Sequence, residues 1–461
     1  MLKGVRFTMP EFTSRWAPGR FSVYNNAGPA VAGVIVEKVS GQSFNAYVDA
    51  HVLRPMGMGS ADFDLTPALA PHLAKSYEPS GRETPFQNII LAPAGSLNTT
   101  ARELAQLVRF FLGRGTVDGK QILTPASVDR IERSESNLAS KDGFTMGYGL
   151  GNAPFPGSGI VFRGHNGEID SFTSVYGYLA RCDCGYVLMA NGGEGVNFNT
   201  PVSAEVEHYL TRGLTCNCAP SPAKSMARPS ADYAGIYGAI TPPNNLIKPL
   251  TDLAGLSRVT AGSDLTITGL SGSAEYEPVS PHVFRRTDRE QPSVAFVEAD
   301  GHVYKLTAFN AAEKQPLWRI VLVAATGIVL VLGAVFAIVM TPFWLIGGFR
   351  GRLKGGWMVR FAPLLSVAAL IATVAMTVRV IAGSGTSALS DLATVGPYSL
   401  TIFAMSLLYP AFALLGLWLG YRRADASMSV RVYAVLVSVA MLAFCAYALP
   451  IGWIGMRSWT M

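Results

Sequence analysis

Charged side chains are scarce in this 461-residue sequence, and where they lie excludes one class of partner. Lys, Arg, Asp and Glu make up 15% of the residues, while hydrophobic residues make up 49%. Residues 318–461 hold ten of the 37 Lys and Arg residues but only two of the 31 Asp and Glu residues, so they carry the positive charge of the chain. Residues 1–317 are slightly acidic. We therefore expect no basic domain and no nucleic-acid partner.

Signals for cofactors and for a leader peptide are also missing. Gly192-Gly193-Glu194-Gly195 follows a predicted strand but lacks the pattern of a phosphate-binding loop. No metal-binding motif stands out, so we expect no cofactor. The first eight residues, MLKGVRFT, contain no apolar run and therefore do not form a signal peptide.

Long apolar runs are abundant in the last third of the chain. Four of them cover about residues 320–346, 358–382, 395–420 and 430–454. Each is longer than the roughly 20 residues that span a bilayer core, and a soluble helix bundle explains four such runs poorly. The sequence therefore predicts a region of four transmembrane helices over residues 318–461.

The basic residues between these runs predict the orientation. They lie between the first and second runs and between the third and fourth: Arg350, Arg352, Lys354, Arg360, Arg422, Arg423 and Arg431. The positive-inside rule places both groups in the cytoplasm. We expect a multi-pass protein of the cell (inner) membrane, with residues 1–317 and the C-terminus on the periplasmic or extracellular side.

Several short motifs occur in a recognisable order before these runs. They are Tyr24-Asn25-Asn26, a helical stretch ending at Ser40-Gly41, Arg54-Pro55-Met56-Gly57-Met58, Pro93-Ala94-Gly95-Ser96-Leu97 and Arg163-Gly164-His165-Asn166-Gly167. Each motif alone is weak. Together, over residues 10–213, they resemble the β-lactamase-like serine hydrolase family, which comprises class C β-lactamases, DD-peptidases and related esterases.

The resemblance implies roles for five residues. Tyr24 matches the base or proton shuttle of the second motif, and Asn26 matches the residue that orients substrate. His165 takes the place of the Lys or His in the third motif. Gly167 lets the strand approach the substrate, and the backbone N–H of Glu168 is one expected oxyanion donor.

The family's nucleophile motif, Ser-x-x-Lys, is absent from the 23 residues before Tyr24. Ser221-Pro222-Ala223-Lys224 matches the letters, but it lies in a Pro-rich stretch where its prolines disfavour the helix start that the motif needs. Without a nucleophile no acyl-enzyme forms. One hypothesis explains both this absence and the missing leader: the chain is an N-terminally truncated form of a longer protein, through a late start or a real truncation.

The predicted fold class is α+β, with a partial β-lactamase/transpeptidase-like fold in which helices flank an antiparallel sheet. We expect this incomplete hydrolase domain over residues 1–214, a linker over 215–229 and a small all-β domain over 230–315. Apolar Val31, Val34, Ile35 and Val39 have helical spacing, and Thr100 with Glu103 predicts a capping box.

Four of the five cysteines form two Cys-x-Cys pairs, Cys182 with Cys184 and Cys216 with Cys218. The first pair lies in a predicted hairpin turn, and the second follows a helix predicted to return toward that turn. One or two disulfides are the expected outcome in an oxidising compartment. A four-thiolate zinc site is an alternative with unusual spacing. Cys445 lies in an apolar run and is interpreted as an apolar filler.

Three functions fit these observations. The first is a membrane-anchored serine hydrolase that acts on an amide or ester of the cell envelope, such as a peptidoglycan peptide, a β-lactam or a small ester, and is inactive as written. The second is a non-catalytic relative that binds an envelope ligand or a membrane partner. The third makes the four-span region a transporter or sensor, but the runs hold few ionisable residues for such a role.

Overall fold

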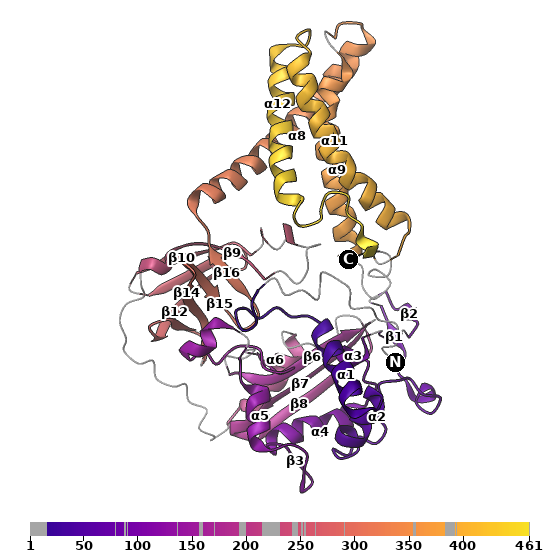
Figure 1. Ribbon diagram of the computed structural model, residues 1–461, viewed down its shortest axis with the longest axis vertical. Helices are drawn as coiled ribbons and strands as arrows, with labels where there is room; N and C mark the ends of the chain where they lie inside the picture. The colour runs from indigo at the N-terminus through magenta and orange to yellow at the C-terminus, as the bar shows by residue number, and fades with distance from the viewer. Residues whose placement is uncertain are drawn as a thin grey trace. The chain divides into compact units, whose positions relative to one another are not determined.

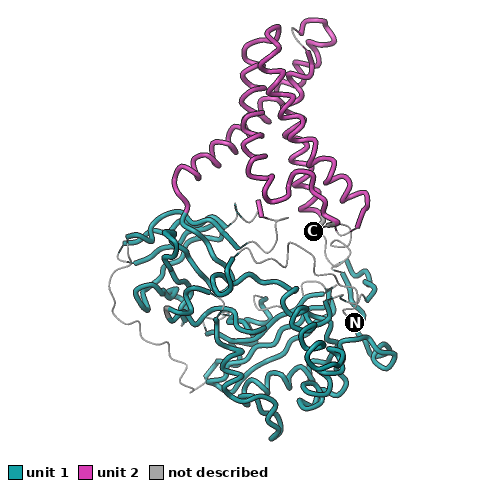
Figure 2. Tube along the Cα trace, viewed as in Figure 1, with its two compact units in different colours: residues 1–243, 251–314 teal, residues 244–250, 315–461 magenta. Residues whose placement is uncertain are grey.

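A computed structural model describes most of the chain. The described residues are 16–78, 80–86, 89, 91–135, 137–155, 160–169, 171–192, 200–213, 231–241, 248–249, 252, 255–262, 264–289, 291–353, 356–382, 392 and 394–460. The chain divides into two compact units, one of residues 1–243 with 251–314 and one of residues 244–250 with 315–461 (Figure 2).

The first unit contains a four-stranded antiparallel sheet in the order β5-β6-β7-β8 (Figure 1). Its strands are β5 (Ala153–Phe155), β6 (Phe162–Ile169), β7 (Phe172–Leu179) and β8 (Cys184–Ala190). Tyr178 packs with residues of α4 (Ala101–Leu112), and Leu179 packs with residues of α6 (Pro201–Thr211). Because successive side chains of a strand point to opposite faces, the two helices cover opposite faces of the sheet.

The helices before the sheet follow the sequence in part. Helix α1 (Ala27–Ser40) ends at Gly41, whose φ of 70° is left-handed, as the Ser-Gly pair predicted. Its expected apolar face, however, does not form a core. Ile35 and Val39 are 56% and 83% exposed, and the buried residues are Ala30 and Gly33. Apolar periodicity located this helix but did not identify its packed side.

The predicted capping box at α4 is half formed. The Thr100 side chain accepts a hydrogen bond from the Glu103 backbone N–H at 3.2 Å. The Glu103 carboxylate does not return to Thr100. Instead it accepts hydrogen bonds from the N–H and hydroxyl of Ser60, both at 2.8 Å. It also accepts from the Thr99 hydroxyl at 3.4 Å, so Ser60 and Thr99 take the place of the Thr100 N–H.

Shorter elements connect these parts. They are α2 (Phe44–Val48), η2 (Asp49–Leu53), η3 (Ala70–His72), β1 (Ser76–Tyr77), β2 (Glu83–Thr84), α3 (Ala92–Gly95), β3 (Thr116–Val117), β4 (Lys120–Gln121), α5 (Pro125–Glu132), η4 (Leu138–Asp142), η5 (Ala180–Cys182) and η6 (Ala231–Tyr233).

The all-β domain is a closed antiparallel barrel of eight strands. The strands are β9 (Gly235–Ala239), β10 (Ser257–Ala261), β11 (Leu265–Gly269), β12 (Gly272–Ser280), β13 (Val283–Arg286), β14 (Pro292–Ala299), β15 (His302–Leu306) and β16 (Ala311–Lys314). Tyr237, Phe284 and Phe296 are fully buried and pack together. Closure leaves no free sheet edge.

One outer wall of the barrel packs on the segments that lead to the four-stranded sheet. Phe21 and Phe144 share a buried cluster with Tyr304 and Leu306 of β15. Arg20 also forms an ion pair with Asp300 in the β14–β15 turn. The barrel is therefore joined to the part that contains the four-stranded sheet by a common core as well as by the chain.

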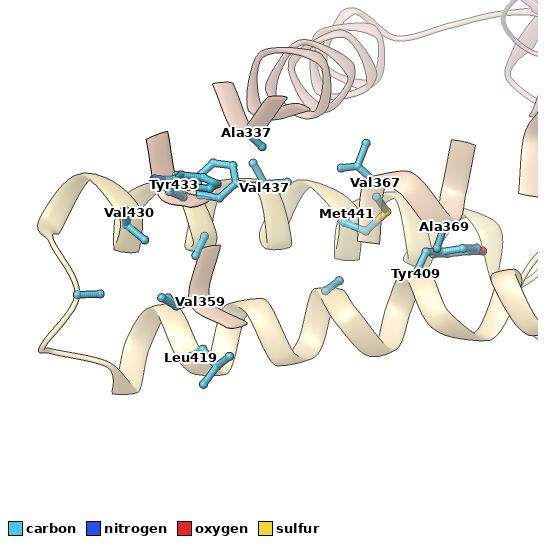
Figure 3. Packing of buried hydrophobic residues seen from close by; sticks show 14 of the residues in the cluster. Ala337, Val359, Val367, Ala369, Tyr409, Leu419, Val430, Tyr433, Val437 and Met441 are labelled. Carbon is cyan, nitrogen blue, oxygen red and sulfur yellow. The ribbon is translucent and has the colours of Figure 1, made fainter. Parts of the chain in front are cut away.

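The second unit contains four helices long and apolar enough to cross a membrane. They are α8 (Leu317–Phe349), α9 (Trp357–Ala382), α11 (Pro397–Arg422) and α12 (Met428–Ala448), followed by η7 (Ser458–Thr460). Figure 3 shows Ala337 of α8 beside Val437 of α12 and Val367 of α9 near Met441. The predicted combination of an α+β region, a small all-β domain and four apolar helices is confirmed.

Arg360, Arg422 and Arg431, which the sequence placed between the apolar runs, lie inside helices. Arg431, in α12, donates from Nε to the carbonyl of Gly420 at 3.1 Å. It thereby provides a hydrogen-bond donor for one of the carbonyl groups left unpaired at the C-terminal end of α11. Arg360, in α9, is 4% exposed and donates to the carbonyl of Gly356 at 3.2 Å. Backbone carbonyls therefore hold both side chains. The Arg431 side chain is held at the C-terminal end of α11, and the Arg360 side chain is held just before the start of α9.

Candidate functional site

The candidate site contains three rings that come from separate parts of the first unit. Tyr24 precedes α1, Tyr148 precedes β5 and His165 lies in β6. The ring centroids of Tyr24 and His165 are 6.0 Å apart, those of Tyr24 and Tyr148 are 5.9 Å apart, and those of Tyr148 and His165 are 6.0 Å apart. The two rings singled out in the sequence, 141 positions apart, therefore lie side by side.

Tyr24 is placed by the buried residue three positions before it. Phe21 is 9% exposed and contacts the rings of Trp16 and Tyr304, each with centroids 5.0 Å apart. The carbonyl of Arg20 accepts a hydrogen bond from the Leu138 N–H at 3.0 Å. These contacts fix the start of the loop, whereas the Tyr24 side chain is 51% exposed. Its phenol is thus presented at the surface by a loop that is anchored in the core.

His165 is held with one preferred arrangement of its ring proton. Its Nδ1 lies 2.6 Å from the Asn166 carbonyl oxygen, which only accepts, so Nδ1 carries the proton. Its Nε2 lies 2.8 Å from the Tyr148 hydroxyl. In neutral His165, Nε2 therefore accepts the hydrogen bond that Tyr148 donates.

Burial sets the protonation of all three groups. It lowers the pKa of His165, and the hydrogen bond to the Asn166 carbonyl opposes this only in part, so the imidazole is neutral at pH 7. Burial raises the pKa of Tyr24. It also raises the pKa of Tyr148, and the nearby Tyr24 phenol adds to that rise. At neutral pH the cluster therefore consists of two phenols and one neutral imidazole.

Tyr148 was not among the site residues that the motifs predicted. Its segment is fixed by hydrogen bonds from the Gly149 N–H to the Asn152 carbonyl, at 2.8 Å, and from the Leu150 N–H to the Ile131 carbonyl, at 2.9 Å. A Cβ on Gly149 would lie 2.1 Å from the Ile131 oxygen. The glycines on both sides of Tyr148 were the available signal, since they indicate a closely packed backbone.

Phe309, a second residue that was missed, comes from the turn between β15 and β16 of the barrel. Its ring centroid lies 6.1 Å from that of Tyr148 and 5.8 Å from that of Phe155 in β5. The turn is closed by hydrogen bonds between Thr307 and Asn310. The barrel therefore contributes a side chain beside the three-ring cluster, which no motif in the sequence predicted.

The other predicted site residues are exposed. Asn26 directly precedes α1, and its side chain makes no capping hydrogen bond. Gly167 and Glu168 follow His165 in β6 and pair with Ser174 and Thr173 of β7. In the described residues β5 pairs only with residues 162–164 of β6, so Gly167 and Glu168 are paired with β7 alone.

The cysteines differ within their first pair. Cys182, in η5 between β7 and β8, is disulfide-bonded, whereas Cys184 is a free thiol. Cys216 and Cys218 lie outside the described residues. A disulfide sulfur is not a thiolate ligand, so a four-thiolate zinc site does not fit this form of Cys182. Burial and the charge of Asp183 raise the pKa of the Cys184 thiol.

Known proteins are similar to the part of the chain that contains these residues. A family model described as Beta-lactamase matches residues 12–206. "Putative beta-lactamase-like 1" of Homo sapiens is 26% identical over 168 residues, which are 35% of this chain and 32% of that protein. "Protein flp" of Staphylococcus aureus (strain MW2) is 25% identical over 178 residues, 38% of this chain and 34% of that protein. The matches thus span about a third of the length of these relatives.

Solved structures also match this chain, at low sequence identity. The crystal structure of SurE matches with 20% identity and a TM-score of 0.38, covering 66% of this chain and 70% of that one. A class C beta-lactamase mutant matches with 16% identity and a TM-score of 0.37, covering 43% of this chain and 61% of that one.

Proposed function

Because residues 12–206 carry a region of the beta-lactamase family, we propose that this chain is a membrane-anchored serine hydrolase of that family. Its substrate class is an amide or ester of the cell envelope, such as a peptidoglycan-like peptide, and its four apolar helices contact membrane lipid. The observation that carries the proposal is the contact between Tyr24 and His165, whose ring centroids lie 6.0 Å apart.

Each residue of the cluster has a task in this proposal. Tyr24 transfers the proton between the nucleophile and the leaving group, and its exposure gives it access to substrate. Neutral His165 packs against that phenol and so holds its position, while Tyr148 and the Asn166 carbonyl fix the imidazole ring. The Glu168 N–H donates to the developing oxyanion, and Gly167 keeps that edge of β6 open.

The same cluster also explains why the chain as written is expected to be inactive. A phenol becomes a base only when its pKa falls toward the working pH, and a nearby cation is the usual cause. Here burial raises the pKa of Tyr24, and burial also lowers the pKa of His165, so the neutral imidazole supplies no positive charge to the phenol. The sequence before Tyr24 holds no Ser-x-x-Lys, which would supply both the nucleophile and the cation.

The second candidate is a non-catalytic relative that binds an envelope amide or ester at the same cluster. The Tyr24 phenol can donate to or accept from a polar ligand, and the Tyr148 hydroxyl, which donates to His165, can still accept. This candidate is favoured by the direction of the Tyr24 and His165 pKa shifts. It differs from the first in one respect, namely that no covalent intermediate forms under any condition.

Covalent labelling separates the two candidates. A fluorophosphonate and a fluorescent penicillin are applied to the 461-residue chain and to the same chain with the in-frame coding sequence upstream of Met1 included. Labelling of the longer protein alone supports the hydrolase, provided that Tyr24→Phe slows the labelling about a hundredfold or more. The control Tyr209→Phe, a 77% exposed residue of α6, should not slow it. Labelling of neither protein supports the binder. Labelling of the 461-residue chain contradicts the expected inactivity.

We also propose that residues 1–317 and the C-terminus lie on the outer side of the cell membrane. Arg350 and Arg352 follow α8, and Arg422 ends α11 with Arg423 directly after it, so both basic connections belong on the cytoplasmic side. An alkaline phosphatase fusion, active only outside the cytoplasm, tests this. Fusion after Met461 is expected to be active and fusion after Arg352 inactive; the reverse pattern contradicts the orientation.

A further inference from the structure

One mouth of the eight-stranded barrel contains a cavity that the hydrolase proposal does not use. Its volume is about 430 Å³, and its lining includes Ser257, Ile267, Tyr276, Arg286 and Lys305. Small-molecule sites occupy about 300–1,000 Å³, and an eight-stranded barrel is just wide enough to hold one small ligand. The size and place of the cavity therefore suit a small molecule.

Lys305 points into the barrel rather than away from it. Along β15, Tyr304 and Leu306 pack in the outer cluster shared with Phe21, so the alternating residues Val303 and Lys305 face the interior. The Lys305 ammonium lies 5.9 Å above the Tyr237 ring and donates a hydrogen bond to the Ser257 hydroxyl. The side chain thus crosses the apolar core and ends at the cavity.

The ammonium of Lys305 has no carboxylate partner among the described residues. The charged and titratable groups that face it are Arg286 from β13, Tyr276 from β12 and Tyr237 from β9. Arg286 is itself paired with Asp288, its Nε 2.7 Å from the carboxylate oxygen. The cavity therefore holds one cation whose charge is unmatched and a second that is already paired.

An unmatched cation in this position destabilises the empty barrel. Burial lowers the pKa of Lys305 to about 8, so removal from water is costly for the charged form. An anion that binds at the mouth would offset that cost, because a charge-assisted hydrogen bond to a buried ammonium is stronger than a neutral one.

We propose that the barrel mouth binds a small organic monoanion, a carboxylate with an apolar part, with the carboxylate on Lys305 and Ser257 and the apolar part against Ile267 and Tyr276. A monoanion is favoured over a dianion because Asp288 already neutralises Arg286. The apolar part is favoured over a bare inorganic ion because Ile267 and Tyr276 form part of the barrel's apolar core.

The test uses the full chain in lipid nanodiscs and 4-phenylbutyrate as the probe, with its neutral amide as the matched comparison. Calorimetric titration is performed on the wild type, on Lys305→Met and on Arg258→Met. Lys305→Met keeps the aliphatic stem without the charge. Arg258→Met removes a cation from the exposed outer side of β10, next to Ser257, and controls for net charge.

The wild type and Arg258→Met are expected to bind the acid, and Lys305→Met to bind it at least tenfold more weakly. The amide should bind the wild type at least tenfold more weakly than the acid. Equal binding of acid and amide, equal binding by Lys305→Met, or no binding of the acid would each overturn the proposal. The probe partitions into the nanodisc lipid to the same extent for the wild type and both variants. This partitioning therefore cancels when their affinities are compared.

A pH titration of the wild type decides the question if Lys305→Met does not fold. The probe stays ionised above pH 7, whereas Lys305 loses its proton above about pH 8. Affinity for the acid is therefore expected to fall as pH rises, approaching tenfold per pH unit well above that pKa. A constant affinity between pH 7 and 10 would contradict a role for the ammonium. Covalent labelling at the Tyr24 cluster is a separate measurement, so the two proposals succeed or fail independently.

Discussion

The hydroxyl of Tyr148 lies 2.8 Å from Nε2 of His165, and this hydrogen bond joins the segment before β5 to the middle of β6. The Asn166 carbonyl occupies the other ring nitrogen of His165 at 2.6 Å. Both nitrogens are therefore engaged within the protein. Tyr24, which contacts the ring without a hydrogen bond to it, has the most freedom to meet a ligand.

Tyr148→Phe is expected to raise the pKa of His165. The hydroxyl stabilises the neutral imidazole because it donates to Nε2, so its removal favours protonation. The worth of one such bond, about 0.5–1.5 kcal/mol, corresponds to roughly 0.4–1 pH unit. NMR titration of the imidazole carbon signals measures the change. Tyr209→Phe, 77% exposed on α6, is the control, and an unchanged His165 pKa in Tyr148→Phe would exclude the assigned donor.

Stability is expected to fall as pH drops below the ordinary pKa of histidine. Burial lowers the pKa of His165 in the folded protein, so the unfolded chain binds the proton more readily. The contribution of His165 is therefore present above about pH 6.5 and is lost as pH falls toward its folded-state pKa, with a slope of at most about 1.4 kcal/mol per pH unit. Thermal unfolding of the wild type, His165→Gln and exposed His208→Gln between pH 7 and 5 tests this. Only His165→Gln should flatten the dependence.

Phe309→Ala is expected to destabilise the first unit and to disturb the three-ring cluster. The ring contacts both Tyr148 and Phe155, and aromatic pairs contribute about 0.5–1.5 kcal/mol each beyond the area they bury. A loss of roughly 1–3 kcal/mol and a shift of the His165 NMR signals should follow. Leu270→Ala, 80% exposed on the same barrel, should cause neither. Unchanged His165 signals in Phe309→Ala would show that the barrel does not influence the cluster.

Cys182→Ser is expected to lower stability by about 2–4 kcal/mol, because it removes a disulfide. Cys184→Ser should change stability far less, since Cys184 is a free thiol. Mass mapping without reductant checks the assignment: Cys182 should resist alkylation in the unfolded chain, and Cys184 should react. Alkylation of both cysteines before reduction would exclude the disulfide.

The order of the motifs was enough to predict that Tyr24 and His165 lie near each other, and their ring centroids are 6.0 Å apart. Tyr148 and Phe309 were not predictable in the same way. Their contacts depend on how the segment before β5 and the β15–β16 turn pack over long sequence separations. Similarly, alternation along β15 separates Tyr304 from Lys305, but only the closed barrel tells which of them faces the interior.

In the helical unit, too, the sequence predicted the elements but not how they pack, and one of these packing contacts gives a further prediction. Hydropathy located the four helices, but not the contact between α8 and α12, where a Cβ on Gly333 would lie 2.2 Å from Val437 Cγ2. Small residues allow such close approach between membrane helices. Gly333→Leu is therefore expected to separate α8 from α12 and to cost roughly 1–3 kcal/mol through overpacking.

Gly327→Leu provides the matched control for that substitution. Gly327 lies on the same helix, and a Cβ at this position would have no neighbouring atom within 4 Å, so the added side chain meets open space. Unfolding in lipid nanodiscs and crosslinking between cysteines placed on α8 and α12 measure the two variants. Gly333→Leu should lower both stability and crosslinking yield relative to Gly327→Leu. Equal stability and equal crosslinking yield of the two variants would mean that α8 does not pack against α12 through Gly333. A leucine at position 333 cannot fit beside Val437 without displacing it.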